Sequence, residues 1–214
     1  SLTGGCHEMK FLTEFRRLFN VQSGASHTIR NESGTQTKSS IIHSWTLSTR
    51  DSPVFPTLGH MIKLTNELAG LTGDAQFFKT ELNLQHNWTR GLFTLTKSFN
   101  IGHSIPIGND CRVPYFDRFQ MGGPTSIRGF SPNSLGPRQF SDALGGTSII
   151  ESGIQLSFPV IKSAANFARA HIFFNAGLLG NFTSRLMSTN FKQSSLSDMH
   201  PNVSVGGGLM FKMA

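Results

Sequence analysis

Hydrophobic and polar residues alternate along several segments of this chain. In residues 147–160, Ile150, Ile154 and Leu156 fall on one side of an extended backbone, and Glu151 and Gln155 fall on the other. A period of two indicates a strand with one apolar face. The pattern predicts strands at 59–72, 76–90, 91–103, 147–160, 168–179 and 202–213, with weaker ones at 21–32 and 38–50.

The length of these strands favours a membrane protein. Several reach the roughly 9–11 residues that a tilted transmembrane strand needs. One face holds Ile, Leu, Val and Phe, and the other holds small, polar and charged residues, which is the division expected between lipid and a wet lumen. The predicted fold class is therefore an all-β, antiparallel transmembrane β-barrel. A soluble β-sandwich alternates in the same way and stays open as an alternative.

Two regions do not alternate. In 8–19, residues Phe11, Phe15 and Phe19 share one side of a helical wheel, so we expect residues 1–20 to form a loop with a short amphipathic helix. Residues 104–141 are rich in Gly, Pro, Ser and Arg, but they also contain several aromatic side chains. They predict a long, folded loop between the strands of 21–103 and those of 142–214.

Composition narrows the function. The chain has 214 residues, 14% charged residues and 19 Phe, and no run of about 20 apolar residues that would form a membrane helix. The net charge of +7 is scattered, without a nucleic-acid-binding motif, so no nucleic acid partner is expected. Hydrolase, metalloprotease, P-loop and dinucleotide-binding motifs are absent, and Cys6 and Cys111 stand far apart. We expect no enzyme, no metal and no cofactor.

The core of the long loop, residues 117–130, reads DRFQMGGPTSIRGF. It combines a Gly122-Gly123-Pro124 turn with the tetrad Ile127-Arg128-Gly129-Phe130. It resembles the family of barrel-assembly proteins that includes bacterial BamA, the two-partner secretion transporters and the mitochondrial sorting and assembly barrel. In that family this loop folds back into the lumen of a 16-stranded barrel, which implies that the chain holds about half of the strands.

The resemblance continues through HIFFNAG at 171–177, and ELAGLTGDAQFFKTELNLQHNW at 67–88 is most similar to the mitochondrial branch. It implies insertion of β-barrel precursors into the mitochondrial outer membrane. The implied mechanism templates the precursor strand at a lateral seam. The implied partners are precursors with β-signal strands, peripheral accessory subunits and outer-membrane lipid. A passive, porin-like pore is the alternative of a different class.

The resemblance also raises a question about Arg128. Family members often carry carboxylates where this chain has Gln155 and Asn175. Arg128 would then meet one of these neutral acceptors or Glu151, and the choice stays open. Residues 204–211 fit the pattern of a β-signal, but we interpret them as an internal strand and expect further strands beyond residue 214.

Overall fold

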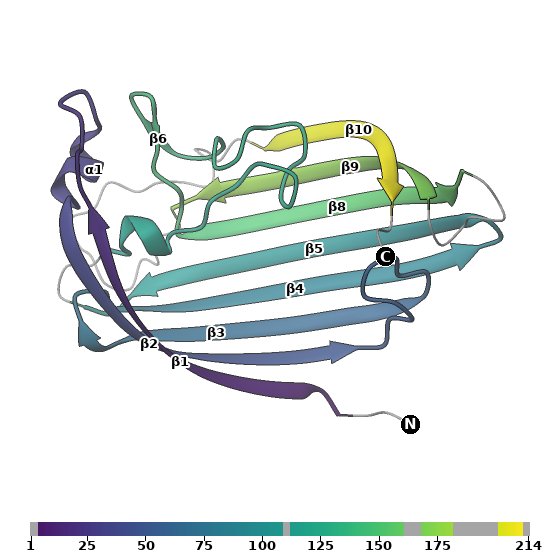
Figure 1. The fold of residues 1–214 in the computed structure, drawn as a ribbon, viewed down its shortest axis with the longest axis horizontal. Coiled ribbons are helices and arrows are strands. Elements are labelled where there is room, and N and C mark those ends of the chain that lie inside the picture. Colours follow the sequence, from purple (N-terminus) through teal and green to yellow (C-terminus); the bar gives the residue numbers. More distant parts are fainter. Residues whose placement is uncertain (1–3, 109–111, 161–167, 182–200, 212–214) are drawn as a thin grey trace.

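The computed structural model describes residues 4–108, 112–160, 168–181 and 201–211. Its main element is one antiparallel sheet of eight strands in the order β1-β2-β3-β4-β5-β8-β9-β10 (Figure 1). The strands are β1 (Cys6–Leu18), β2 (Gly34–Ser48), β3 (Gly59–Gly73), β4 (Phe77–Arg90), β5 (Phe93–Pro106), β8 (Ser148–Pro159), β9 (Ala168–Gly180) and β10 (Asn202–Phe211).

Smaller elements lie in the connections. A helix, α1 (His27–Asn31), lies between β1 and β2. A 3-10 helix at Tyr115–Asp117 and the two-residue strands β6 (Arg138–Gln139) and β7 (Asp142–Ala143) lie in the long loop between β5 and β8. No helix in the described part of the chain is long and apolar enough to cross a membrane.

The two faces of the sheet differ as the alternation predicts. Side chains on the face away from the long loop are largely apolar and open, such as Phe99, Ile154 and Phe174, which are 38%, 46% and 46% exposed. No second sheet covers this face among the described residues. A β-sandwich would bury this face, whereas an exposed apolar face agrees with the predicted barrel wall.

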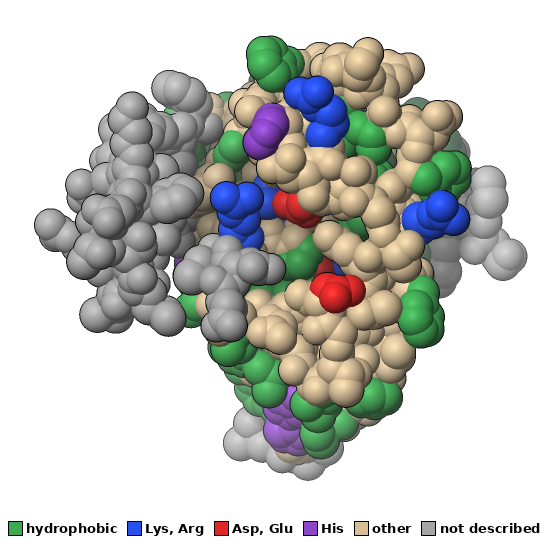
Figure 2. Space-filling view, turned by 90° about the vertical axis from the view of Figure 1, so that its left-hand side faces the viewer, with side chains coloured by type: hydrophobic (Ala, Val, Ile, Leu, Met, Phe, Trp, Pro, Cys, Tyr) green, Lys and Arg blue, Asp and Glu red, His purple; other side chains and the backbone are tan. Residues whose placement is uncertain are grey.

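The sheet curves around the loop. Asp117 of the loop binds Arg16 of β1, at one edge of the sheet. Farther along the loop, a Cβ atom placed on Gly129 would lie 3.9 Å from Ser204 of β10, at the other edge. Figure 1 shows β1 and β2 bending toward α1 and the loop. Viewed from the end that holds α1, the acidic side chains lie toward the middle, basic ones also reach the outline, and apolar ones gather along the lower outline (Figure 2).

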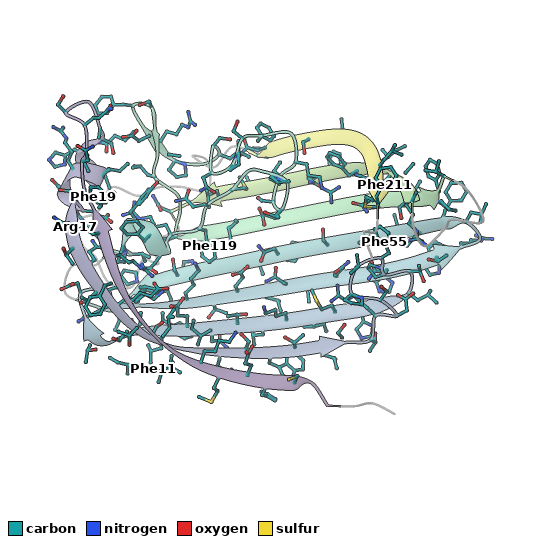
Figure 3. All side chains as sticks on the ribbon, viewed as in Figure 1. Phe11, Arg17, Phe19, Phe55, Phe119 and Phe211 are labelled. Atoms are coloured by element: carbon teal, nitrogen blue, oxygen red, sulfur yellow. The ribbon has the colours of Figure 1, made fainter. Side chains whose placement is uncertain are left out.

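The predicted helix at 8–19 is wrong, because residues 8–18 belong to β1. Phe11, Phe15 and Phe19 are spaced by four, which suits one face of a helix and one face of a strand equally well. Pairing with β2 along the whole of β1 decides for the strand. Phe11 and Phe15 are 69% and 81% exposed on the outer face, and Phe11 points away from the sheet in Figure 3.

The weak strand predicted at 21–32 is also wrong. This segment turns and forms α1, whose N-cap is Ser26. The Ser26 hydroxyl accepts a hydrogen bond from the backbone N–H of Ile29 at 3.3 Å. A serine N-cap satisfies a backbone donor that a helix leaves free at its start. The other predicted strands are confirmed, with ends that move by a few residues; residues 212–213 of the last one lie outside the described part.

The main buried core lies between the loop and the inner face of β8 and β9. It is made of Phe119, Met121, Ile127 and Leu135 from the loop and Ile149 and Leu179 from the strands, and Figure 3 shows Phe119 between the loop and the sheet. Glycine permits this approach. A Cβ atom on Gly177 would lie 2.7 Å from the Met121 sulfur and 2.8 Å from Cδ1 of Ile127.

Replacing Gly177 with valine should therefore lower the free energy of unfolding. The new side chain has no room between β9 and the loop, and overpacking of this kind costs about 1–3 kcal/mol. Urea unfolding of the full-length protein in detergent micelles measures the loss. Ala176→Val is the matched control, because residue 176 faces outward on the same strand. Equal losses in the two variants would contradict the packing described here.

Candidate functional site

The tip of the long loop is shaped by its glycines and a serine. The backbone N–H of Gly122 donates to the Ser126 hydroxyl at 3.2 Å, and the Ser126 N–H donates to the Gly123 carbonyl at 3.3 Å. Gly122 has a φ of 112°, and a Cβ there would lie 2.6 Å from the Ser131 carbonyl oxygen. Only glycine fits that position. Gly123 and Pro124 follow, so the chain reverses within a few residues and carries residues 127–130 to the sheet.

Arg128 lies against the inner wall of β8 and β9. Its Nη1 donates to Oε1 of Gln155 at 2.8 Å, and its guanidinium carbon lies 4.7 Å from the centre of the Phe173 ring. Burial lowers the pKa of Arg128, and the side chain stays charged because arginine begins so high. The sequence left open which residue accepts a hydrogen bond from Arg128. In the structure the acceptor is the neutral amide of Gln155.

The neighbours of Arg128 fix the rest of the tip. Ile127 is 1% exposed within the core, and Phe130 packs against the same core. Gly129 has a positive φ of 89°, which glycine adopts without strain. The side chains on either side of Gly129 therefore meet different surroundings, with Arg128 on the polar wall and Phe130 on the apolar core.

Glu151 and Asn175 contact the loop through Ser126. The Ser126 hydroxyl donates to Glu151, and Asn100 of β5 donates to the other oxygen of that carboxylate at 3.0 Å. The Asn175 amide donates to the Ser126 carbonyl at 3.3 Å. The three wall residues singled out from the sequence thus all lie beside the tip, but Gln155 alone of the three binds Arg128 in the structure.

A polar cavity of about 370 Å³ lies between the tip and the strands. Its lining includes Glu81, Asn83, Asn100 and Glu151 from β4, β5 and β8, and Ser126 from the loop. No group of three His, Cys, Asp or Glu side chains gathers as metal ligands would anywhere in the described ranges. Water in this cavity can form hydrogen bonds with the polar groups of the loop tip, in addition to the hydrogen bonds that the strands provide.

The base of the loop is held by a buried ionic cluster that sequence reasoning missed. Asp117 has a side chain only 3% exposed. Its two carboxylate oxygens bind Arg16 of β1 at 2.7 Å and Lys38 of β2 at 2.8 Å. Lys38 also pairs with Glu67 of β3, and Lys79 of β4 donates to the Asp117 backbone carbonyl at 3.1 Å. Asp117 therefore contacts three strands directly and a fourth, β3, through Lys38.

A second set of contacts ties the loop to the β1–β2 connection. Arg118 donates to Glu32 at 2.9 Å, and the pKa of Arg118 is lowered by burial despite that carboxylate. The Ser26 backbone N–H donates to the Asp142 carboxylate at 2.7 Å, and the Thr28 hydroxyl donates to Gln139 at 3.0 Å. These polar contacts therefore join the β1–β2 connection to the long loop.

Asp117→Asn should destabilise the protein. It leaves Arg16 and Lys38 buried with one carboxylate fewer, and breaking a buried pair costs about 3–5 kcal/mol when nothing replaces the lost charge. Glu14 and Glu67 remain as partners, so we expect a loss of about 3 kcal/mol in urea unfolding. Glu8→Gln, which breaks an exposed pair with Lys10, should cost under about 1 kcal/mol. Similar losses would refute the anchoring role of Asp117.

Comparison with known proteins identifies the family. The model of the Omp85 superfamily domain matches residues 7–214. The sorting and assembly machinery component 50 homologs of Xenopus laevis (homolog A) and Homo sapiens are each 39% identical to the chain, over 82% of it and 39% of their own length. The SAM50-like protein of Schizosaccharomyces pombe is 37% identical over 98% of the chain and 45% of its own length.

The chain thus spans less than half the length of these curated relatives. Among solved structures, the crystal structure of BamA from Haemophilus ducreyi lacking POTRA domains 1-3 superimposes with a TM-score of 0.70 over 84% of the chain and 37% of that structure, at 17% identity. The fold is that of an outer-membrane barrel wall, and the chain belongs to the Omp85 superfamily.

Proposed function

We propose that this chain forms part of a barrel that inserts β-barrel precursor proteins into the mitochondrial outer membrane. The observation that carries the proposal is the loop held across the inner wall, with its Ile127–Phe130 tip on β8 and β9 and Arg128 bonded to Gln155. The names of the relatives, sorting and assembly machinery components, agree with it. The chain lies in the mitochondrial outer membrane.

The proposed task requires no covalent chemistry. An incoming strand carries unpaired backbone N–H and C=O groups, which are costly in hydrocarbon until they find partners. A sheet edge supplies those partners by strand addition. In this proposal the edge lies at a lateral seam of the complete barrel, to which further strands of the longer protein contribute. The loop supports the wall from inside while the seam opens.

The loop is suited to this role because its two ends are held differently. The base is fixed by buried ion pairs from Asp117 to β1 and β2. The tip is held by packing of Ile127 in the core and by single hydrogen bonds from Arg128, Ser126 and Asn175. The proposed partners are precursors with β-signal strands, which meet the barrel at the seam, and accessory subunits that dock on its water-exposed ends.

Arg128→Ala in the full-length protein should slow the assembly of porin-type precursors in isolated mitochondria by about five- to tenfold. The reason is the loss of one charge-assisted hydrogen bond, worth about 1–1.5 kcal/mol. The rate is measured from imported, radiolabelled precursor resolved on native gels. Membrane extraction of the same samples shows whether the variant barrel is itself inserted.

Arg138→Ala is the matched control. It removes the same charge from the same loop, and no side-chain bond of Arg138 occurs in the described structure. Slower assembly in both variants would mean that the charge of the loop matters rather than the tip contact. A variant barrel that fails to insert would make Arg128 a structural pin. If depletion of the wild type leaves precursor assembly unchanged, the passive pore replaces the proposal.

A further inference from the structure

A row of cationic and ionisable side chains crosses the lipid-facing surface of the sheet. His60 of β3 lies directly opposite His86 of β4, and His86 lies opposite Lys97 of β5. Residues opposite each other in neighbouring strands have Cβ atoms about 5 Å apart. All three share the outward face with Ile62, Leu84 and Phe99 in the adjoining row, so the cationic row borders an apolar one.

A groove of about 450 Å³ runs beside this row. Its floor and sides are mostly apolar, formed by the row of Ile62, Leu84 and Phe99 and by Ile154 of β8. Ser152 lines the groove and lies opposite Phe99, and Ala176 lies opposite Ser152 on the next strand. Two small side chains thus follow a large one along this row of the outer face.

The charge at the head of the groove is not balanced locally. Lys97 is exposed and has no carboxylate within ion-pair distance among the residues that the structure describes. The carboxylates of β3, β4 and β8, which are Glu67, Glu81 and Glu151, lie at inward positions of their strands. A lysine on a lipid-facing wall needs an anion, and phosphate groups of lipids are the anions that a membrane offers.

The row also lies close to the expected depth of lipid headgroups. Trp88 follows His86 on the same face of β4 and is 50% exposed, and Phe93 at the start of β5 is 53% exposed and contacts Phe158. Exposed aromatic residues near strand ends mark the boundary between hydrocarbon and headgroups in membrane barrels. The row is one step inward from this girdle, within reach of a phosphate by extension of Lys97.

We propose that this groove is a binding site for an anionic phospholipid. Lys97 binds the phosphate, and His60 and His86 lie beside it as further donors. The Thr49 hydroxyl lies 3.2 Å from Nδ1 of His60, which leaves Nε2 for the lipid. One acyl chain lies in the groove over Leu84, Phe99 and Ser152. The site is on the outer wall, on the opposite side of the sheet from the loop, and is independent of precursor insertion.

The test is native mass spectrometry of the full-length protein, titrated with phosphatidylglycerol or phosphatidylcholine of identical acyl chains. Both lipids carry a phosphate, but only the first carries a net charge. We expect tighter binding of phosphatidylglycerol. Lys97→Gln should weaken it about fivefold, the effect of removing one lysine near a charged headgroup, and should leave phosphatidylcholine binding within about twofold.

Lys63→Gln is the matched control, because residue 63 lies at an inward position of β3, opposite Asn83. It should leave binding of both lipids unchanged. Ser152→Phe fills the groove and should weaken both lipids, while Ser152→Ala should not. Equal binding of the two lipids, equal effects of Lys97→Gln and Lys63→Gln, or unchanged binding in Ser152→Phe would each overturn the proposal. If Ser152→Phe does not fold, the two lysine variants decide.

Discussion

The structure depends on what fills the inner side of its single curved sheet. A sandwich buries its apolar face against a second sheet, but here that face is turned outward and the polar face is turned inward. The interior therefore has to be supplied by the chain itself. The β5–β8 loop provides four of the six residues in the main core, and Gly177 and Gly102 remove the side chains that would hold it away from the wall.

Two kinds of bond hold the loop, and their strengths differ. At the base, Asp117 is enclosed with Arg16 and Lys38, and separating such buried charges costs several kcal/mol. At the tip, the charge-assisted hydrogen bond from Arg128 to the neutral amide of Gln155 contributes about 1–1.5 kcal/mol. A carboxylate at position 155 would strengthen the tip contact. Because Gln155 carries a neutral amide instead, the contact of Arg128 at the tip is weaker than the ion pairs of Asp117 at the base.

The long strands could be predicted from the sequence because one face is apolar and the period is two. The prediction failed at β1, where phenylalanines spaced by four suit a helix and a strand alike. It failed again at α1, where a serine N-cap outweighs a weak alternation. The tip was recognisable because its residues are adjacent in sequence. Asp117 was not, because its partners Lys38 and Arg16 lie 79 and 101 residues away along the chain.

The same separation of faces explains the distribution of charge. Glu67, Glu81 and Glu151 lie at inward positions, where water, amides and lysines can satisfy them. Because these carboxylates lie inward, the outer wall of their strands carries no unpaired anion in hydrocarbon. A cation on that wall then has no carboxylate partner on these strands either. Lys97 fits the outer wall only near the headgroups, where lipid provides the counter-charge.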